Sequence, residues 1–91
     1  TFDDYADYYY NRSLCFYELK KYTESENDMS VYISRVRDDP DAYYFRCLIN
    51  YYNKNKNAAC DDARKAIELG KKEFPPEIIK SCKLKKLLND N

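Results

Sequence analysis

Apolar side chains recur every three or four residues along most of the chain, which is the spacing of one face of an α-helix. In the first segment Tyr5, Tyr9, Phe16 and their neighbours follow this spacing. Short polar stretches interrupt the pattern. The pattern therefore predicts an all-α chain with helices over about 4–19, 23–36, 40–53, 58–69 and 76–88.

Capping signals agree with these helix ends. Asp39 before Pro40 is typical of an N-cap followed by proline in the first turn. The Asn- and Lys-rich stretch 53–57 predicts a turn, and Gly70 lies where a helix C-terminal cap is expected. Gly70 is the only glycine and there are three prolines, a scarcity that favours helices joined by short polar turns over β-rich folds.

The strongest signal is an internal repeat. Shifting the chain by 34 residues against itself aligns nine identical pairs without a gap. They are Asp7/Asp41, Tyr9/Tyr43, Tyr10/Tyr44, Arg12/Arg46, Leu14/Leu48, Tyr17/Tyr51, Lys20/Lys54, Asp28/Asp62 and Ile33/Ile67. Self-similarity at this period is the mark of stacked helix–turn–helix units.

The repeated residues resemble the tetratricopeptide repeat family. The first copy of its pattern is Tyr9, Arg12, Ser13, Phe16, Ser25, Met29 and Tyr32, and the second is Tyr43, Arg46, Cys47, Asn50, Ala59, Ala63 and Ala66. Asn50 departs from the aromatic residue usual there, and Lys71 replaces the proline that usually ends a repeat. The resemblance implies a right-handed solenoid of helical hairpins. Its parts are repeat one over about 6–39, repeat two over about 40–73 and a capping helix over about 76–89.

The resemblance also implies a binding surface, because the first helix of each repeat lines the inner side of the curved array. This places a Tyr-rich groove at Asp7, Tyr10, Leu14, Tyr17, Asp41, Tyr44, Leu48, Tyr51 and Tyr52. Tyrosine suits peptide anchoring, since it offers a large contact area, few rotors and a hydroxyl. We therefore expect a module that binds a partner protein or peptide with apolar anchors, and Asp7 and Asp41 favour a basic residue on that partner.

Some of these tyrosines have an alternative role in the core. Tyr9 and Tyr43 are expected to be core residues, while Tyr10, Tyr17, Tyr44 and Tyr51 are consistent with either role. A groove that recognises a chaperone's terminal carboxylate is disfavoured, because Asp41 and Phe45 stand where the family's carboxylate clamp has lysine and arginine.

Charge suggests a second function. Residues 1–45 carry ten acidic and five basic side chains, and residues 46–91 carry six acidic and eleven basic ones, so the halves have net charges of −5 and +5. The alternative is therefore a structural spacer or self-associating fragment of a longer repeat array. The stretch 1–4 shows no cap before the first helix, which also favours a fragment.

Composition argues against catalysis and against cofactors. The chain has no histidine, so no Cys–His pair can form, and its single glycine cannot build a phosphate-binding loop. We expect no catalytic residue, no metal and no cofactor. Lys80, Lys83, Lys85 and Lys86 crowd the last helix apart from the aromatics, which favours a solvated cap over nucleic-acid binding.

The four cysteines, Cys15, Cys47, Cys60 and Cys82, form no C-x-x-C pair. Small buried packing residues are the first interpretation, and a Cys60–Cys82 bridge between neighbouring helices is the second. No apolar run approaches the length of a membrane span, so we expect a soluble protein without membrane insertion. A cytoplasmic location is favoured, or an oxidising compartment if the bridge forms.

Overall fold

The chain folds into helices only, as the hydrophobic pattern predicts. The computed structural model describes residues 4–89, and within this range every regular element is helical. The helices are α1 (Asp4–Glu18), α2 (Tyr22–Arg35), α3 (Pro40–Tyr52), α4 (Lys56–Glu68), α5 (Pro76–Cys82) and α6 (Lys85–Asn89). The prediction of an all-α chain is confirmed.

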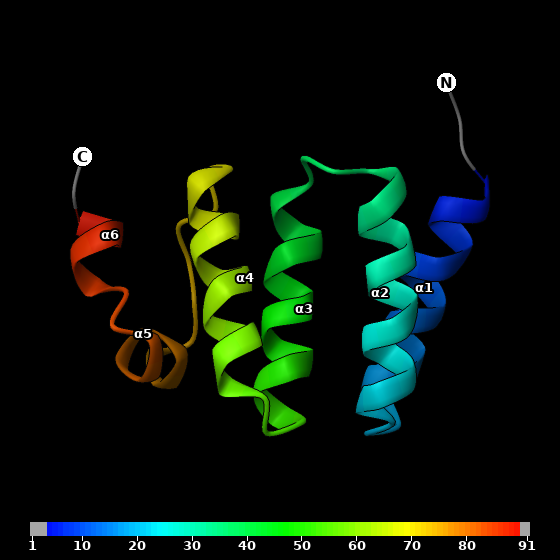
Figure 1. Ribbon diagram of the computed structural model, residues 1–91, viewed down its shortest axis with the longest axis horizontal. Coiled ribbons are helices and arrows are strands. Elements are labelled where there is room, and N and C mark those ends of the chain that lie inside the picture. Colours follow the sequence, from blue (N-terminus) through cyan, green and yellow to red (C-terminus); the bar gives the residue numbers. More distant parts are fainter. Residues whose placement is uncertain (1–3, 90–91) are drawn as a thin grey trace.

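Consecutive helices pack against each other in a row. The contacts join α1 to α2, α2 to α3, α3 to α4 and α4 to α5. Figure 1 shows α1 and α2 at one end of the molecule, α3 and α4 in the middle, and α5 and α6 at the other end. Helix α5 runs across the direction of α1–α4 and closes that end of the row.

The first four helices form two equivalent hairpins. Hairpin one is α1 with α2, and hairpin two is α3 with α4. Helix α1 ends at Glu18 and α3 at Tyr52, while α2 begins at Tyr22 and α4 at Lys56, so both boundaries recur after 34 residues. The sequence repeat is therefore also a structural repeat.

Small residues let the two helices of each hairpin approach closely. In hairpin one the hydroxyl of Ser13 donates to the carbonyl of Ser25, and the hydroxyl of Ser25 donates to the carbonyl of Ser13, both at 2.7 Å. The equivalent residues in hairpin two are Cys47 and Ala59. All four are fully buried.

An arginine–aspartate pair ties each hairpin together. Arg12 donates to Asp28 through Nε and Nη2 at 2.6 and 2.9 Å, and Arg46 donates to Asp62 through the same atoms at 2.9 and 2.8 Å. Each guanidinium also lies 5.6 Å from the ring centre of the tyrosine three residues earlier, Tyr9 or Tyr43. These two tyrosines therefore share the same arginine contact, and both are partly exposed residues that pack against the core, Tyr9 against one apolar cluster and Tyr43 against two.

Four helix ends share one kind of turn. Its central residue has positive φ at Lys20 (61°), Lys54 (64°), Gly70 (111°) and Lys83 (56°). The next residue donates its amide to the carbonyl five positions earlier, in the pairs Lys21–Phe16, Asn55–Asn50, Lys71–Ala66 and Leu84–Ile79. This satisfies carbonyls that the last turn of a helix leaves without a partner. The prediction of a C-terminal cap at Gly70 is confirmed.

Two helix predictions need correction. The single capping helix predicted over about 76–89 is two short helices, because the left-handed turn at Lys83 redirects the chain and places Leu84 in the core with no exposed surface. The fourth helix begins at Lys56 rather than 58, because the side chain of Asn55 accepts a hydrogen bond from the amide of Ala58 and caps it. The N-cap at Asp39 is confirmed, since its carboxylate accepts from the amide of Asp41 at 3.0 Å.

Two apolar clusters form the core. One fills the junction between α2 and α3 and includes Met29, Ile33 and Ile49. The other joins hairpin two to the cap and includes Ala63 and Ile78. The side chains of Tyr17, Tyr43 and Phe45 pack against both clusters and so link the two hairpins.

Candidate binding surface

The structure separates the nine predicted groove residues by exposure. Asp7, Asp41 and Tyr52 are exposed, and Tyr10, Leu14, Tyr17, Tyr44 and Tyr51 are partly buried. Leu48 belongs to the core, so it offers a partner almost no surface and is removed from the predicted site. The reason is that Leu48 packs in the cluster that joins hairpin two to the cap, whereas the equivalent Leu14 only packs against the edge of the other cluster.

One part of the predicted groove, away from the turn between α1 and α2, contains a row of aromatic rings. Tyr10 meets Phe45 with ring centres 6.1 Å apart, Phe45 meets Tyr44 at 5.4 Å, and Tyr44 meets Phe74 at 5.4 Å. All three contacts are edge-to-face, the arrangement that aromatic pairs prefer. The row runs from α1 across α3 to the loop before α5, so Tyr10 and Tyr44 have both core and surface roles.

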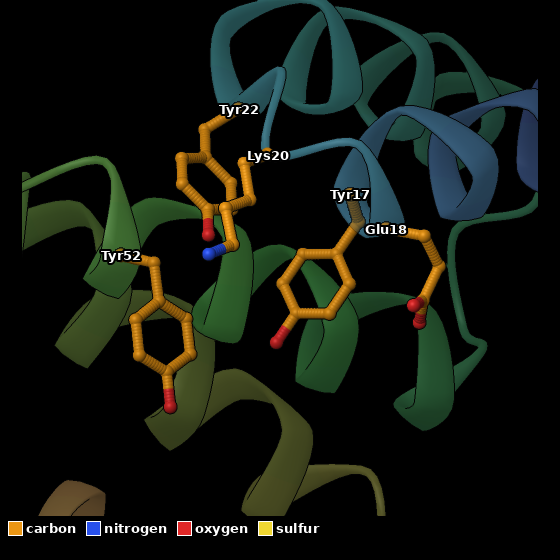
Figure 2. A pocket seen from close by; sticks show the side chains of 5 residues that line it. All are labelled: Tyr17, Glu18, Lys20, Tyr22 and Tyr52. Carbon is orange, nitrogen blue, oxygen red and sulfur yellow. The ribbon is translucent and has the colours of Figure 1, made fainter.

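The other part of the predicted groove, at the turn between α1 and α2, is an open hollow. It measures about 220 Å³ and is lined by Tyr17 and Glu18 of α1, Lys20 of the following turn, Tyr22 of α2 and Tyr52 of α3. We call these residues the tyrosine hollow. Figure 2 shows the three tyrosines, with Tyr22 and Tyr17 on the two sides and Tyr52 below them. Their ring centres lie 5.9–6.3 Å from each other, and the pair Tyr22–Tyr52 is stacked.

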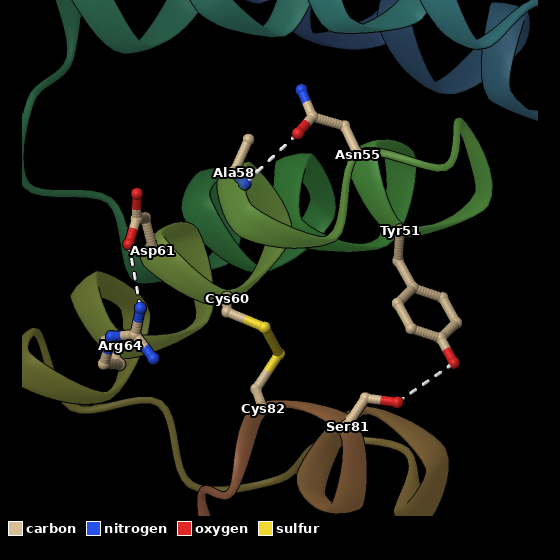
Figure 3. Close-up of a disulfide and its surroundings, with 8 residues drawn as sticks. All are labelled: Tyr51, Asn55, Ala58, Cys60, Asp61, Arg64, Ser81 and Cys82. Carbon is tan, nitrogen blue, oxygen red and sulfur yellow. Dashed lines mark hydrogen bonds and ion pairs between the residues drawn. A yellow bond between two sulfur atoms is a disulfide. The ribbon is translucent and has the colours of Figure 1, made fainter.

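Helix α3 links the tyrosine hollow to the cap. The ring of Tyr52 contacts that of Tyr51 edge-on at 5.5 Å, and its hydroxyl donates to Glu77 of α5 at 3.4 Å. The Tyr51 hydroxyl lies 3.4 Å from the hydroxyl of Ser81, also in α5, as Figure 3 shows. Tyr51 therefore points toward the cap, while Tyr52 forms one wall of the hollow.

The acidic residues of the predicted groove differ in availability. The carboxylate of Asp41 accepts a hydrogen bond from the ammonium group of Lys71 at 3.0 Å, and the same ammonium lies 4.4 Å from the ring centre of Tyr44. The expectation that Asp41 attracts a basic group on a partner is therefore weakened, because Lys71 already fills that role. Asp7 and Glu18 are exposed carboxylates on the same helix.

Burial and neighbouring groups raise the pKa of three tyrosines of this surface, Tyr10, Tyr17 and Tyr52. Burial, with the nearby charges of Asp39 and Asp41, raises the pKa of Tyr10 to about 12. The pKa of Tyr17 is raised by burial and by the neighbouring Tyr52. The pKa of Tyr52 is raised by burial and by Glu77. The hydroxyls therefore remain neutral hydrogen-bonding groups at physiological pH.

Sequence reasoning missed five residues of this surface, namely Lys20, Tyr22, Phe45, Lys71 and Phe74. Lys20 is repeated as Lys54, but the other four have no identical counterpart in the other repeat, so a comparison based on the 34-residue shift could not find them. Phe74 did carry a signal, since it is a large aromatic residue between Glu73 and two prolines in a predicted loop. Such a residue in a polar connection indicates an anchor to the core, where Phe74 is buried.

A second hollow of about 250 Å³ lies over the ion pair of hairpin two. Its walls are Glu26, Arg46, Asn50, Ala58, Asp61 and Asp62. Burial lowers the pKa of Arg46, but the hydrogen bonds and charge of Asp62 more than offset this effect, so the pKa is raised overall. Asn50 donates to Asp62 at 3.2 Å, which explains a polar residue where the repeat pattern has an aromatic one.

The cysteines divide into three kinds. Cys60 of α4 and Cys82 of α5 form a disulfide, with Cα atoms 5.2 Å apart, as Figure 3 shows. For Cys60 and Cys82 the structure therefore shows the second interpretation of the sequence, a bridge between neighbouring helices, rather than two free packing residues. Cys47 is a buried packing residue, and burial together with Asp62 raises the pKa of its thiol to about 12. Cys15 is exposed, contrary to the packing interpretation.

Within residues 4–89, no group of three or more His, Cys, Asp and Glu side chains is arranged to hold a metal ion. None of the helices in this range is both long and apolar enough to cross a membrane. Comparisons of the chain with protein-family models, with curated proteins and with solved structures gave no match.

Proposed function

We propose that this protein is a tetratricopeptide-like interaction module that binds a segment of a partner protein on the surface formed by α1, α3 and the turn before α2. The support for the tetratricopeptide-like part is the agreement between sequence repeat and structural repeat. The helix boundaries at the turn inside each hairpin, the small buried residues and the arginine–aspartate pairs recur after 34 residues.

The tyrosine hollow is the observation that carries the binding proposal. Three contacting tyrosines from three different helices line an open space on the surface, and Tyr52 is 41% exposed. A chain gains little stability from leaving such rings in contact with water, whereas rigid aromatic walls around a concavity are typical of anchor sites for a partner side chain. The hollow is large enough for one apolar side chain.

The charges at the edge of the hollow indicate the chemistry of the partner. Glu18 and Lys20 line the hollow. Asp7 is an exposed carboxylate nearer the N-terminus of α1. A partner segment with an apolar or aromatic anchor and a basic residue beside it would satisfy both the hollow and the α1 carboxylates. The module thus recognises a short motif rather than an extended flat surface.

Selection from a displayed library of random peptides tests the proposal. We expect enriched peptides to share an apolar or aromatic anchor next to Lys or Arg. The Tyr52→Ala variant should bind them about tenfold more weakly or worse, because truncating an aromatic anchor site removes much of the binding energy. The matched control is Leu87→Ala, since Leu87 is 46% exposed but lies on α6 at the far end of the row. Equal binding by both variants would contradict the proposal.

A second candidate is self-association through the opposite charges of the two halves, −5 for residues 1–45 and +5 for residues 46–91. Electrostatic association of this kind weakens as salt screens the charges. Sedimentation at low and high ionic strength separates the candidates. A monomer at both salt concentrations removes the self-association function and leaves the peptide-binding one.

The Cys60–Cys82 disulfide bears on location. Such bonds persist in oxidising compartments and are rare in the reducing cytosol, so we infer that the protein works in an oxidising compartment rather than the cytoplasm. Alkylation of the native protein before reduction checks this inference. We expect labels on Cys15 but not on Cys60 or Cys82, and labelling of all three would contradict it.

A further inference from the structure

The contact between the two hairpins shows which face of a hairpin's first helix binds a neighbouring helix. Helix α3 presents Ala42 and Ile49 to α2, and both are almost completely buried in the cluster that contains Met29 and Ile33. The Nη1 atom of Arg46 also donates to the hydroxyl of Ser30 in α2, at 3.1 Å. The α2–α3 contact therefore combines apolar packing with one specific polar contact.

The equivalent face of α1 is uncovered. Subtracting 34 from Ala42, Arg46, Ile49 and Asn53 gives Tyr8, Arg12, Cys15 and Leu19. We call these four residues the α1 end face. Tyr8 and Leu19 are 51% and 65% exposed, and Cys15 is exposed as well. Figure 1 shows α1 as the outermost of the four long helices, at the end of the row.

The spacing of the α1 end face is that of a helix-binding stripe. Its residues follow each other at intervals of four, three and four, so Tyr8, Arg12 and Cys15 line one side of α1 and Leu19 continues that side just after the helix ends at Glu18. Single exposed hydrophobic residues need no explanation, but an aligned set on a helix does. The repeat supplies the explanation, because the same stripe on α3 is where α2 packs.

On the α1 end face, a residue of α1 itself makes the polar contact with the arginine that a neighbouring helix makes on α3. The Nη1 atom of Arg12 donates to the hydroxyl of Tyr8 at 2.7 Å, whereas the same atom of Arg46 donates to Ser30 of the neighbouring helix. Tyr8 thus offers Arg12 the hydroxyl that an adjacent helix would supply. Arg12 is accordingly more exposed than Arg46, 43% against 21%.

We propose that the α1 end face binds an amphipathic helix of a partner protein whose chemistry resembles that of α2. Its apolar residues would correspond to Met29 and Ile33, and a hydroxyl near them would take the place of the Tyr8 hydroxyl on Arg12. The expected partner is a single helix, since one helix covers the equivalent face of α3.

A second copy of this chain is a poor source of that helix. The corresponding faces of both second helices are in use, because α2 packs against α3 and α4 packs against α5. The bond between Cys60 and Cys82 holds α5 on α4. A copy would have to open one of these contacts before it could offer a helix, whereas a partner helix needs no such change.

A peptide with the sequence of residues 22–36 is a direct probe, because it carries the chemistry of α2. The protein's own α2 is tethered beside α3 at high effective concentration, so added peptide will not displace it. We expect saturable binding by fluorescence anisotropy. The control peptide replaces Met29 and Ile33 by serine and should bind about tenfold more weakly or worse.

Variants locate the peptide on the protein. Leu19→Glu puts a charge on the α1 end face and should weaken binding about tenfold or more, since the carboxylate would be buried without a partner. Leu87→Glu is the matched control at the other end of the molecule and should bind normally. Both residues are well exposed, so both variants should keep the native melting temperature within a few degrees.

The exposed thiol of Cys15 gives an independent readout. Saturating peptide should slow alkylation of Cys15 at least severalfold, because the bound helix covers it. Peptide binding that leaves Cys15 as reactive as before, or that is lost in Tyr52→Ala, would overturn the inference in favour of the tyrosine hollow. Protection of Cys15 by raising the protein concentration without peptide would overturn it in favour of a second copy. Absence of binding up to millimolar peptide would also overturn it.

Discussion

At the scale of residues, the arginine–aspartate pairs are the most informative feature of the repeat. Both pairs span sixteen residues and use the same two nitrogen atoms of the guanidinium. They differ in their surroundings, because Arg46 is covered by α2 and shares Asp62 with Asn50, whereas Arg12 faces solvent. The two hairpins therefore provide an internal comparison of one interaction in two environments.

Asp62→Ala should lower the free energy of unfolding by about 3–5 kcal/mol, because it leaves a largely buried guanidinium and Asn50 without their acceptor. Asp28→Ala should cost less, about 1–3 kcal/mol, since water can reach Arg12. The control is Asp61→Ala, because Asp61 is exposed and pairs with Arg64 on the surface of α4, and it should change stability by less than about 1 kcal/mol. Urea denaturation measures all three, and equal losses for Asp28 and Asp62 would contradict this ranking.

The raised pKa of Tyr10 makes the free energy of unfolding depend on pH in the alkaline range. The folded state holds the proton of Tyr10 more tightly than the unfolded chain does, since its pKa is raised from 10 to about 12. Its contribution is complete below pH 10 and is lost as pH rises from 10 toward 12. Tyr10→Phe should flatten this part of the decline in urea midpoints measured at pH 9, 10 and 11. An unchanged slope would show that Tyr10 titrates normally.

At the scale of helices, the unexpected feature is lysine in left-handed turns. Lys20, Lys54 and Lys83 adopt the conformation that Gly70 adopts, although a side chain makes it unfavourable. A scarcity of glycine in the sequence predicts short turns but not which residue takes the positive φ. The sequence therefore predicted one capping helix where the chain forms two, because no glycine marks the break at Lys83.

Lys54→Gly should raise the free energy of unfolding by about 1 kcal/mol, since glycine adopts positive φ without steric cost. Lys65→Gly is the opposite control, because Lys65 lies inside α4 and glycine there should cost about 1 kcal/mol. Thermal unfolding followed by circular dichroism shows whether each variant is more or less stable than the natural chain. A destabilised Lys54→Gly would mean that the Lys54 side chain makes a contribution that the conformation does not reveal.

At the scale of the whole molecule, the sequence repeat predicted the two hairpins. It did not predict the aromatic contacts of Tyr22, Phe45 and Phe74, because these residues occur in one repeat only. It also placed Leu48 in the groove, since periodicity alone does not distinguish a partly exposed leucine in α1 from its buried equivalent in α3. That difference arises from the cap, which covers hairpin two and leaves hairpin one open.

The disulfide determines how firmly the cap is held. It closes a loop between residues separated by 22 positions, and a loop of this size stabilises a fold by about 3 kcal/mol. Reduction should therefore lower the melting temperature by about 10–20 °C. The amides of α5 and α6 should lose protection from hydrogen exchange before those of α1–α4. The variant Cys15→Ser should respond to reductant as the natural chain does, and Cys60→Ser should not respond.

The central claim is that the tyrosine hollow between the hairpins is where a partner segment binds. The most direct measurement is a titration of the isotope-labelled protein with a selected peptide, followed by amide chemical shifts. We predict that the largest shift changes lie at Tyr17, Lys20, Tyr22 and Tyr52, in the hollow that joins α1, α2 and α3. Changes confined to α4, α5 and α6, with the hollow unaffected, would contradict the claim.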